Sequence, residues 1–110
     1  MSDHFNRLTS AEAERLALLA EECGEVVQAI GKVLRHGYES VNPDVDLART
    51  NREELAVEIG HVVAASNLLM LRGDLDQALV YRSAGQKTLK VGKYLHHQEN
   101  ALAALDKEGA

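Results

Sequence analysis

The spacing of apolar residues in two long stretches, about 10–36 and 51–72, constrains the fold of this chain more than any other feature. In both stretches apolar side chains recur at the three- and four-residue intervals of a helix that buries one face. Thr9 followed by Glu12 predicts a capping box, and Gly37 predicts the end of a helix from about Ser10 to His36. The chain is therefore expected to be helical from its first element.

A second helix is predicted between Asn51 and Gly73, because Asn51 and Glu54 have the spacing of another capping box and glycine commonly ends a helix. Residues 37–50 make a long connection for a compact helical protein, and such loops are often functional or mobile. This connection separates the two stretches that carry the strongest helical signal.

A third helix is predicted to begin at Asp74 and Gln77 and to reach as far as Leu95, although it contains two glycines. The segment 99–109 predicts a short last helix or a frayed end. No repeat, low-complexity segment or linker divides the chain. We expect one helical domain over residues 1–110, with a core at about 8–97 and a tail at 98–110.

The length and composition favour an all-α protein that associates with copies of itself. The chain has 110 residues, of which 45% are apolar and 26% charged, with few aromatic residues and a single proline. A chain of this length is small for a self-sufficient core. We therefore expect an antiparallel helical bundle completed by dimerisation or tetramerisation.

The same properties bear on location and partners. No apolar run approaches the length of a membrane span, and the polar start of the chain does not resemble a signal peptide. One cysteine cannot form an intramolecular disulfide, which fits a reducing cytosol. The net charge of −5 argues against nucleic acid and anionic membranes as partners. The expected location is the cytoplasm.

Acidic side chains interrupt both apolar patterns. On a helical wheel Glu22 falls inside the apolar arc of the first helix, and Glu25 shares its face three residues later. On the second helix Glu58 lies among apolar residues, with His61 and Glu54 on the same polar stripe. Burying an unpaired carboxylate costs several kcal/mol, so these groups need protons, basic partners or a metal ion. Hard dications bind carboxylates, and facing helices of a bundle can hold such a site.

A simpler interpretation exists for each residue taken alone. A Glu-x-x-Glu spacing is common on solvated helix faces. Glu54 is better explained as a capping residue than as a ligand, Glu21 as either an outer ligand or a solvated side chain, and Cys23 as a small buried hydrophobe. The recurrence of carboxylates inside two apolar arcs is the part that these interpretations leave unexplained.

The segments "EECGE" and "EELAVEIGH" resemble the all-α, MazG-like nucleoside triphosphate pyrophosphohydrolases. The resemblance covers about residues 8–97 and includes "VLRHGYES", "NREEL" and "KYLHHQ", as in the small stand-alone members of bacteria and phages. It implies hydrolysis of a nucleoside triphosphate to the monophosphate and pyrophosphate with Mg²⁺. Glu22, Glu25 and Glu58 correspond to the metal-binding glutamates, and Glu21 to an acidic residue that often precedes them.

His61 departs from the family pattern, which has aspartate at this position. A neutral imidazole removes one negative charge from the ligand set and suits Mn²⁺ better than Mg²⁺. His61 is then a working ligand with altered metal preference, the mark of a weak enzyme, or the mark of an inactive relative. The simplest interpretation is a histidine at the edge of the core, hydrogen-bonded to Glu54 or Glu58. The predicted cofactor is Mg²⁺ or Mn²⁺.

The third predicted helix lacks acidic residues between Gln77 and Gln98 and carries a basic stripe at helical spacing: Arg82, Gln86, Lys90, Lys93 and His97, with Lys87 beside it. Such a stripe facing the carboxylates can hold a triphosphate and stabilise the leaving pyrophosphate. Among these residues we expect Arg82, Lys87, Lys90 and Lys93 to bind substrate. A solvated basic face is the alternative for each lysine. Lys32 and Arg35 are weaker candidates.

The expected mechanism is attack of a water on the α-phosphorus, with Glu21 or Glu25 orienting or deprotonating that water, and with Tyr38 either stacking on the base or closing the loop. The rival hypothesis is a weak or inactive helical homo-oligomer that acts as an interaction module, with its carboxylates paired to basic residues. A nucleic-acid role for the basic helix is a weaker option. The expected partners are a nucleoside triphosphate and further copies of the chain.

Overall fold

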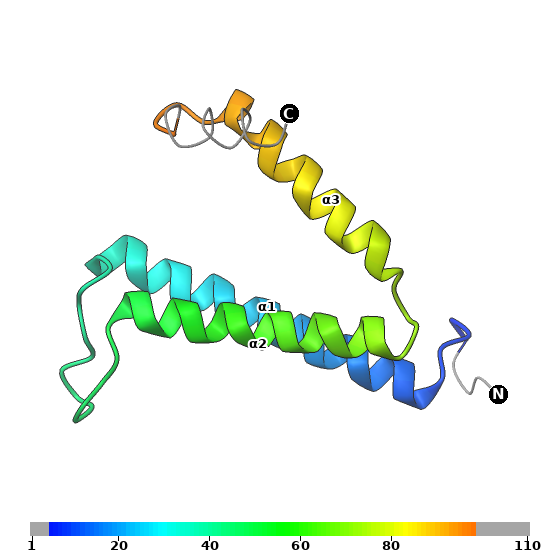
Figure 1. Cartoon of the computed structure of the whole chain (residues 1–110). Helices are drawn as coiled ribbons and strands as arrows, with labels where there is room; N and C mark the ends of the chain where they lie inside the picture. Colours follow the sequence, from blue (N-terminus) through cyan, green and yellow to red (C-terminus); the bar gives the residue numbers. More distant parts are fainter. Residues whose placement is uncertain (1–4, 99–110) are drawn as a thin grey trace. The chain divides into compact units, whose positions relative to one another are not determined.

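The computed structural model describes residues 5–98, and every regular element in that part of the chain is helical (Figure 1). Its elements are α1 (Ser10–His36), α2 (Asn51–Leu71), α3 (Gln77–Lys90) and the 3-10 helix η1 (Val91–Tyr94). Within these residues an isolated bridge between Val41 and Thr50 is the only β-type pairing. The all-α class is confirmed, and α1 begins and ends at the predicted residues.

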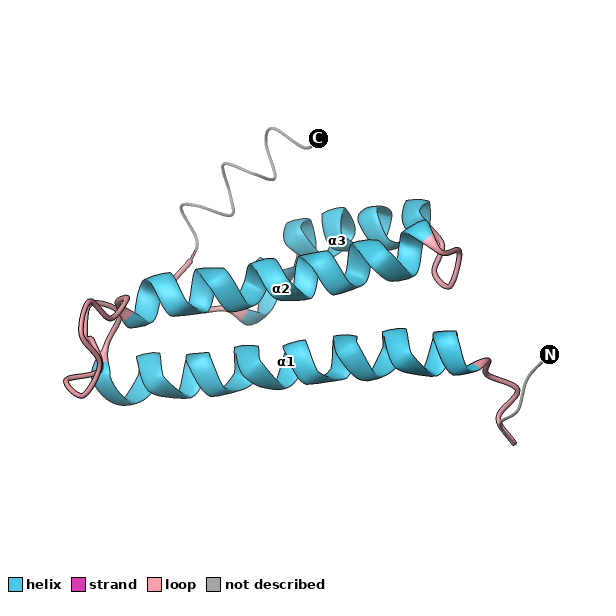
Figure 2. Ribbon diagram, turned by 90° about the horizontal axis from the view of Figure 1, so that it is seen from below, coloured by secondary structure: helices cyan, strands magenta, loops and turns pink. Residues whose placement is uncertain are grey.

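Helices α1 and α2 form an antiparallel hairpin, joined by the long loop and side by side in both views (Figures 1 and 2). Three residues are buried along their contact: Ala29 on α1, and Ala65 and Leu69 on α2. Two of the three are alanines, whose small side chains fill little space between the helices. The core of this unit is a narrow strip between two helices, not a closed bundle.

The N-terminal caps of both helices follow one pattern, shifted by one residue from prediction in the second case. The Thr9 hydroxyl accepts from the Glu12 amide at 3.1 Å, and the Glu12 carboxylate accepts from the Thr9 amide at 2.8 Å. At α2 the pair is Thr50 and Glu53, and the predicted pair of Asn51 and Glu54 was wrong. Thr50 has the extended backbone of a capping residue, whereas Asn51 is already helical.

The end of α2 explains a second difference from prediction. Gly73, at a φ of 82°, donates to the Met70 carbonyl while Asp74 donates to that of Leu69, which is a Schellman motif. Asp74 therefore ends α2 instead of starting the third helix. The cap of α3 is Asp76, whose carboxylate accepts from the amides of residues 78 and 79.

An ion pair fixes this end of the hairpin to the first half of α1. The Arg15 guanidinium donates to both carboxylate oxygens of Asp74, from Nε at 2.6 Å and from its second terminal nitrogen at 2.9 Å. This hydrogen bonding lowers the pKa of Asp74 and raises the pKa of Arg15. The sequence does not indicate this pairing, because the two partners are 59 residues apart.

The chain divides into two compact units, residues 1–74 and 75–110. In the second unit α3 ends at Lys90, and η1 carries the chain to Tyr94 before an extended Leu95. The α-helix therefore ends before the predicted limit of Leu95, and a 3-10 turn takes the place of its last residues. Residues 99–109, predicted as a last helix or frayed end, lie outside the described residues. The single domain stays a prediction.

Burial of the apolar residues differs most from expectation. α2 is apolar nearly all round, which predicted a buried helix, yet among its residues only Ala65 and Leu69 are buried. Cys23, predicted to be buried, is exposed. The reason is geometric: one neighbouring helix covers one face only. By length and composition α2 is also long and apolar enough to cross a membrane, so the expectation that no segment reaches this was wrong. The core helix of a soluble protein meets the same criterion, and the cytoplasmic location stays a prediction.

Candidate functional site

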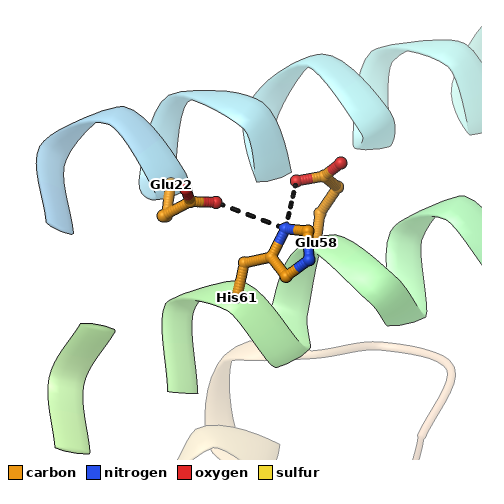
Figure 3. A group of neighbouring side chains, drawn as sticks. All are labelled: Glu22, Glu58 and His61. Carbon is orange, nitrogen blue, oxygen red and sulfur yellow. Dashed lines mark ion pairs between the residues drawn. The ribbon is translucent and has the colours of Figure 1, made fainter. Parts of the chain in front are cut away.

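Three predicted site residues meet between α1 and α2. Glu22 comes from α1, Glu58 and His61 come from α2, and their side chains point toward one another (Figure 3). One possible ligand atom from each lies within 4.8 Å of the others. The His61 Nδ1 is 3.4 Å from a carboxylate oxygen of Glu22 and 3.4 Å from one of Glu58. We call these three residues the acidic trio.

Helix periodicity explains why the two glutamates meet. Glu22 lies seven residues before the buried Ala29 on α1, and Glu58 lies seven residues before the buried Ala65 on α2. Seven residues are almost two full turns, so each glutamate lies on the face that contacts the other helix. The side chains of Glu22 and Glu58 are 19% and 18% exposed. They are partly desolvated between the helices but not sealed from water.

His61 has a different position in the trio. It lies three residues after Glu58, toward the edge of the contact, and its side chain is 53% exposed. Its partners are Glu22 and Glu58, whereas the simplest expectation named Glu54 or Glu58. An imidazole at this place can act as a nitrogen ligand beside two carboxylates or, when protonated, as their cationic partner. The geometry is compatible with both roles.

The other predicted acidic residues lie around the trio. Glu25 and Glu58 line a small cavity of about 40 Å³ together with Glu54 and Lys32. Glu25 is exposed and outside the group of three that can share one cation. Glu21 is exposed on α1. Glu54, expected to be a cap, instead lies 3.7 Å from the Arg49 guanidinium, because Glu53 provides the capping carboxylate.

Tyr38, a predicted substrate contact, lies in the loop between α1 and α2. The Arg52 guanidinium sits 4.3 Å from the centre of its ring and donates to Glu39 at 2.8 Å. The Arg52 amide also donates to the Tyr38 carbonyl at 2.9 Å. The tyrosine therefore helps to hold the loop against the start of α2, which agrees with its expected alternative role of closing the loop.

The basic residues predicted on the third helix belong to the second unit, whereas the weaker candidates Lys32 and Arg35 lie on α1 in the first. Arg82, Lys87 and Lys90 are exposed on α3, and Lys93 is exposed on η1. His97 lies beyond η1, so the basic stripe is helical only as far as Lys90 and cannot continue to His97 at α-helical spacing. Their role in substrate binding stays a prediction.

Comparisons with models of protein families, with curated proteins and with solved structures found no match to this chain. The resemblance to MazG-like enzymes therefore rests on the motif residues themselves.

Proposed function

We propose that this protein is a metal-dependent nucleoside triphosphate pyrophosphohydrolase. One observation carries the proposal: two half-buried carboxylates and an imidazole converge from facing helices at the motif positions. A solvated face does not produce this convergence, because solvated glutamates on separate helices have no reason to point into the contact between them. The resemblance supplies the reaction, and the geometry supports the site.

The donor set of the acidic trio fits a divalent cation. Glu22 and Glu58 offer oxygen atoms, which Mg²⁺ prefers, and His61 offers a nitrogen that Mn²⁺ accepts more readily. In the absence of a cation, His61 is the only residue between positions 5 and 98 that forms an ion pair with either carboxylate. When bound, the metal neutralises phosphate charge and lowers the pKa of a coordinated water.

The chain's own residues then have distinct roles. Glu22, Glu58 and His61 hold the cation, and Glu25, beside the small cavity with Glu58, completes the acidic wall. Glu25 or Glu21 accepts the proton of the attacking water. The water oxygen bonds to the α-phosphorus, the bond to the bridging oxygen breaks, and pyrophosphate leaves with that bridging oxygen. A side-chain nucleophile is not required.

A second copy of the chain is part of the proposal. Six exposed residues on α1 alternate at intervals of four and three, which is the spacing of a helix–helix seam: Leu16, Ala20, Cys23, Val27, Ile30 and Leu34. On α2 the exposed Ala56, Ile59 and Val63 follow the same rule. We call these nine residues the apolar face. Such a pattern is typical of a surface that packs against further helices.

Both parts of the apolar face lie on one side of the hairpin. At 100° per residue, the stripe on each helix is rotated about the helix axis by roughly 120° from the side that faces the other helix. The sense of this rotation is the same on α1 and α2. In an antiparallel pair this places both stripes on one side, while Glu25 and His61 are turned the opposite way. A second hairpin packed on the apolar face therefore leaves the polar side of the acidic trio open to substrate. Dimer and tetramer both satisfy this arrangement.

The same apolar face also favours the rival function, a helical interaction module without activity. Its exposed apolar residues require a partner whether or not the trio binds metal. In this case His61 is the cationic partner of the two glutamates, and the acidic trio has a purely electrostatic role. The two functions predict different responses to divalent ions.

The experiment is pyrophosphate release from a panel of canonical and modified nucleoside triphosphates, with Mg²⁺ and with Mn²⁺. The melting temperature is followed in parallel as each ion is titrated. An enzyme with a metal site releases pyrophosphate and is stabilised by mass action, because the ion binds the folded state. An interaction module shows neither response. Absence of both responses would remove the proposed activity and leave the module.

A further inference from the structure

The end of the hairpin that carries the connecting loop contains a pocket that the sequence does not predict. It has a volume of about 700 Å³ and is lined by the end of α1, the connecting loop and the start of α2. Ligand pockets in proteins typically have volumes of about 300–1,000 Å³. The pocket is thus large enough for an organic molecule, whereas the small cavity beside Glu25 and Glu58, at about 40 Å³, has room for an ion or a few waters.

The pocket has two chemically different walls. Lys32, Arg35 and His36 line it from the last two turns of α1. The facing loop contributes an apolar wall, which consists of Val41, Pro43, Val45 and Ala48. A ligand that uses both walls has a flat or aliphatic part and an anionic part. Simple inorganic anions need only the first wall, and uncharged apolar molecules need only the second.

The loop that forms the apolar wall is held in place by several contacts. The Asn51 side chain donates to the Gly37 carbonyl at 3.1 Å, and the Asn51 amide donates to the Ser40 carbonyl at 2.9 Å. Val41 pairs with Thr50 in the isolated bridge. These bonds join the two ends of the loop to each other. The pocket is therefore largely formed before a ligand enters.

The pocket adjoins the acidic site. Lys32, Asn51 and Glu54 line both the large pocket and the small cavity, which in turn borders Glu25 and Glu58. Glu25 and Lys32 lie seven residues apart on one face of α1, which corresponds to about 10 Å along the helix axis. A ligand that fills the pocket and extends past Lys32 reaches the carboxylates without leaving the polar side of the hairpin.

We infer that this pocket holds the nucleoside part of the substrate, with the base against the apolar wall and the phosphate chain passing Lys32 toward Glu25 and Glu58. The inference rests on the proposed hydrolysis of nucleoside triphosphates and adds the direction in which the substrate lies along the hairpin. It assigns Lys32 and Arg35 to the sugar–phosphate part of the substrate. Base selectivity then depends on the loop residues Val41, Val45 and Ala48 of the same chain.

The test compares two probes in Mg²⁺ by calorimetry: the α,β-methylene analogues of the four common deoxynucleoside triphosphates, which are not cleaved, and inorganic tripolyphosphate. Ala48→Trp fills the pocket from its apolar wall. We expect it to weaken binding of the best analogue about ten- to hundredfold, as for other steric changes in a specificity pocket. Tripolyphosphate, which has no nucleoside, should bind Ala48→Trp as it binds the wild type.

Two further variants make the result decisive. Val45→Ser trims an exposed side chain of the same wall without adding bulk, and should weaken the analogues by a smaller factor. Ala11→Trp, at the opposite end of α1, makes the same substitution at an exposed alanine and should change neither probe. In parallel, methyl NMR signals of Val41 and Val45 should shift with an analogue and not with tripolyphosphate.

The outcomes separate this inference from the proposed function. If Ala48→Trp and Val45→Ser bind the analogues as the wild type does, the nucleoside lies elsewhere and the inference fails while the proposed activity stands. Equal weakening of both probes in these variants also overturns it, because the pocket would then serve the phosphates. If the wild type binds neither probe in Mg²⁺ or Mn²⁺, the proposed function fails and the inference fails with it.

Discussion

The two sides of the α1–α2 hairpin have opposite character, although the same two helices form both. On one side lie Glu25, Lys32 and Glu54 around a small cavity, and the exposed side chain of His61 is turned toward the same side. On the other side lies the apolar face, where Val27 is 69% and Leu34 is 81% exposed. Glu22 and Glu58 sit between the two sides, in the contact itself.

This contrast suggests that chemistry and assembly are separated across one thin layer. A hairpin with only three buried residues is poorly covered by itself, and its apolar side gains most from a partner. Burial of its polar side does not stabilise the protein, because removing charged groups from water costs free energy. Variants on one side should therefore change activity without changing assembly, and variants on the other side should primarily change assembly.

The largest expected effect is on the chemical side. Glu22→Gln removes a ligand and should lower pyrophosphate release by at least about a hundredfold, since even indirect partners of metal ligands contribute 10- to 100-fold. Without metal the variant should be as stable as the wild type or slightly more stable, because one charge leaves a repulsive pair. The matched control is Glu14→Gln, two turns earlier on α1 and exposed. Retained turnover in Glu22→Gln excludes Glu22 from the site.

The second effect is on assembly. Val27→Glu places a carboxylate in the middle of the apolar face, where burial without a partner costs several kcal/mol. We expect sedimentation or light scattering to show a monomer at concentrations where the wild type is a dimer or tetramer. Ala17→Glu, an exposed position turned away from the apolar face, serves as the control.

Cys23 provides an independent readout of the same prediction. It lies one turn before Val27 on the apolar face and is exposed in the single chain. A thiol reagent should therefore react slowly with the wild-type oligomer and faster with Val27→Glu. A wild type that is monomeric and reacts rapidly would show that the apolar face has no second copy on it.

The sequence predicted the parts of this structure that depend on local chemistry. The capping box of Thr9 and Glu12, the stop at Gly37 and the glycine that ends α2 all depend on neighbours within a few residues. Glu22 and Glu58 could also be placed in the contact, because seven residues separate each from a small apolar residue at a predictable angle. The predicted position of the capping box at α2 was wrong because Thr50 and Asn51 are both good capping residues, and only their backbone angles distinguish them.

Features that depend on distant neighbours were missed. The Arg15–Asp74 pair joins residues that are 59 positions apart in the sequence but lie at the same end of the hairpin, and no spacing rule connects them. The prediction that α2 is buried was wrong for the same kind of reason. An apolar helix indicates that other residues pack against it, but not that these residues belong to the same chain. The large pocket depends on the path of the loop over residues 37–50, which hydrogen bonds from Asn51 determine.

His61→Asp sharpens the comparison within the chemical side. The substitution replaces a neutral nitrogen ligand with a carboxylate, so Mg²⁺ should be held more firmly and the ratio of Mg²⁺ to Mn²⁺ activity should rise about tenfold. The oligomeric state should not change, because His61 is turned away from the apolar face. The measurement is pyrophosphate release at equal concentrations of each ion, chosen below saturation so that a change in metal affinity changes the rate. An unchanged ratio would mean that His61 does not contact the metal and serves only as a partner of the two glutamates.

The smallest expected effect is on thermal stability, at the end of the hairpin where the start of α1 meets the end of α2. Asp74→Asn breaks the two-bond ion pair with Arg15 and keeps the backbone hydrogen bonds of the Schellman motif. The variant should melt at a lower temperature at neutral pH with unchanged metal preference. Asp76→Asn is the control, because it removes a carboxylate of the same type and asparagine caps a helix equally well.

The pH dependence of this loss has a definite sign. Arg15 donates to the Asp74 carboxylate and so lowers its pKa in the folded state below the ordinary value for aspartate, about 3.9. The unfolded chain therefore binds the proton first as the pH falls, and protonation favours unfolding. The stabilisation by Asp74 is complete above the ordinary pKa and disappears as the pH falls through the lowered one. The gap in melting temperature between wild type and Asp74→Asn should therefore be constant from neutral pH down to about pH 5, narrow below about pH 4 and close at lower pH. A gap that persists unchanged in acid would assign the loss to packing of the side chain instead of to its charge.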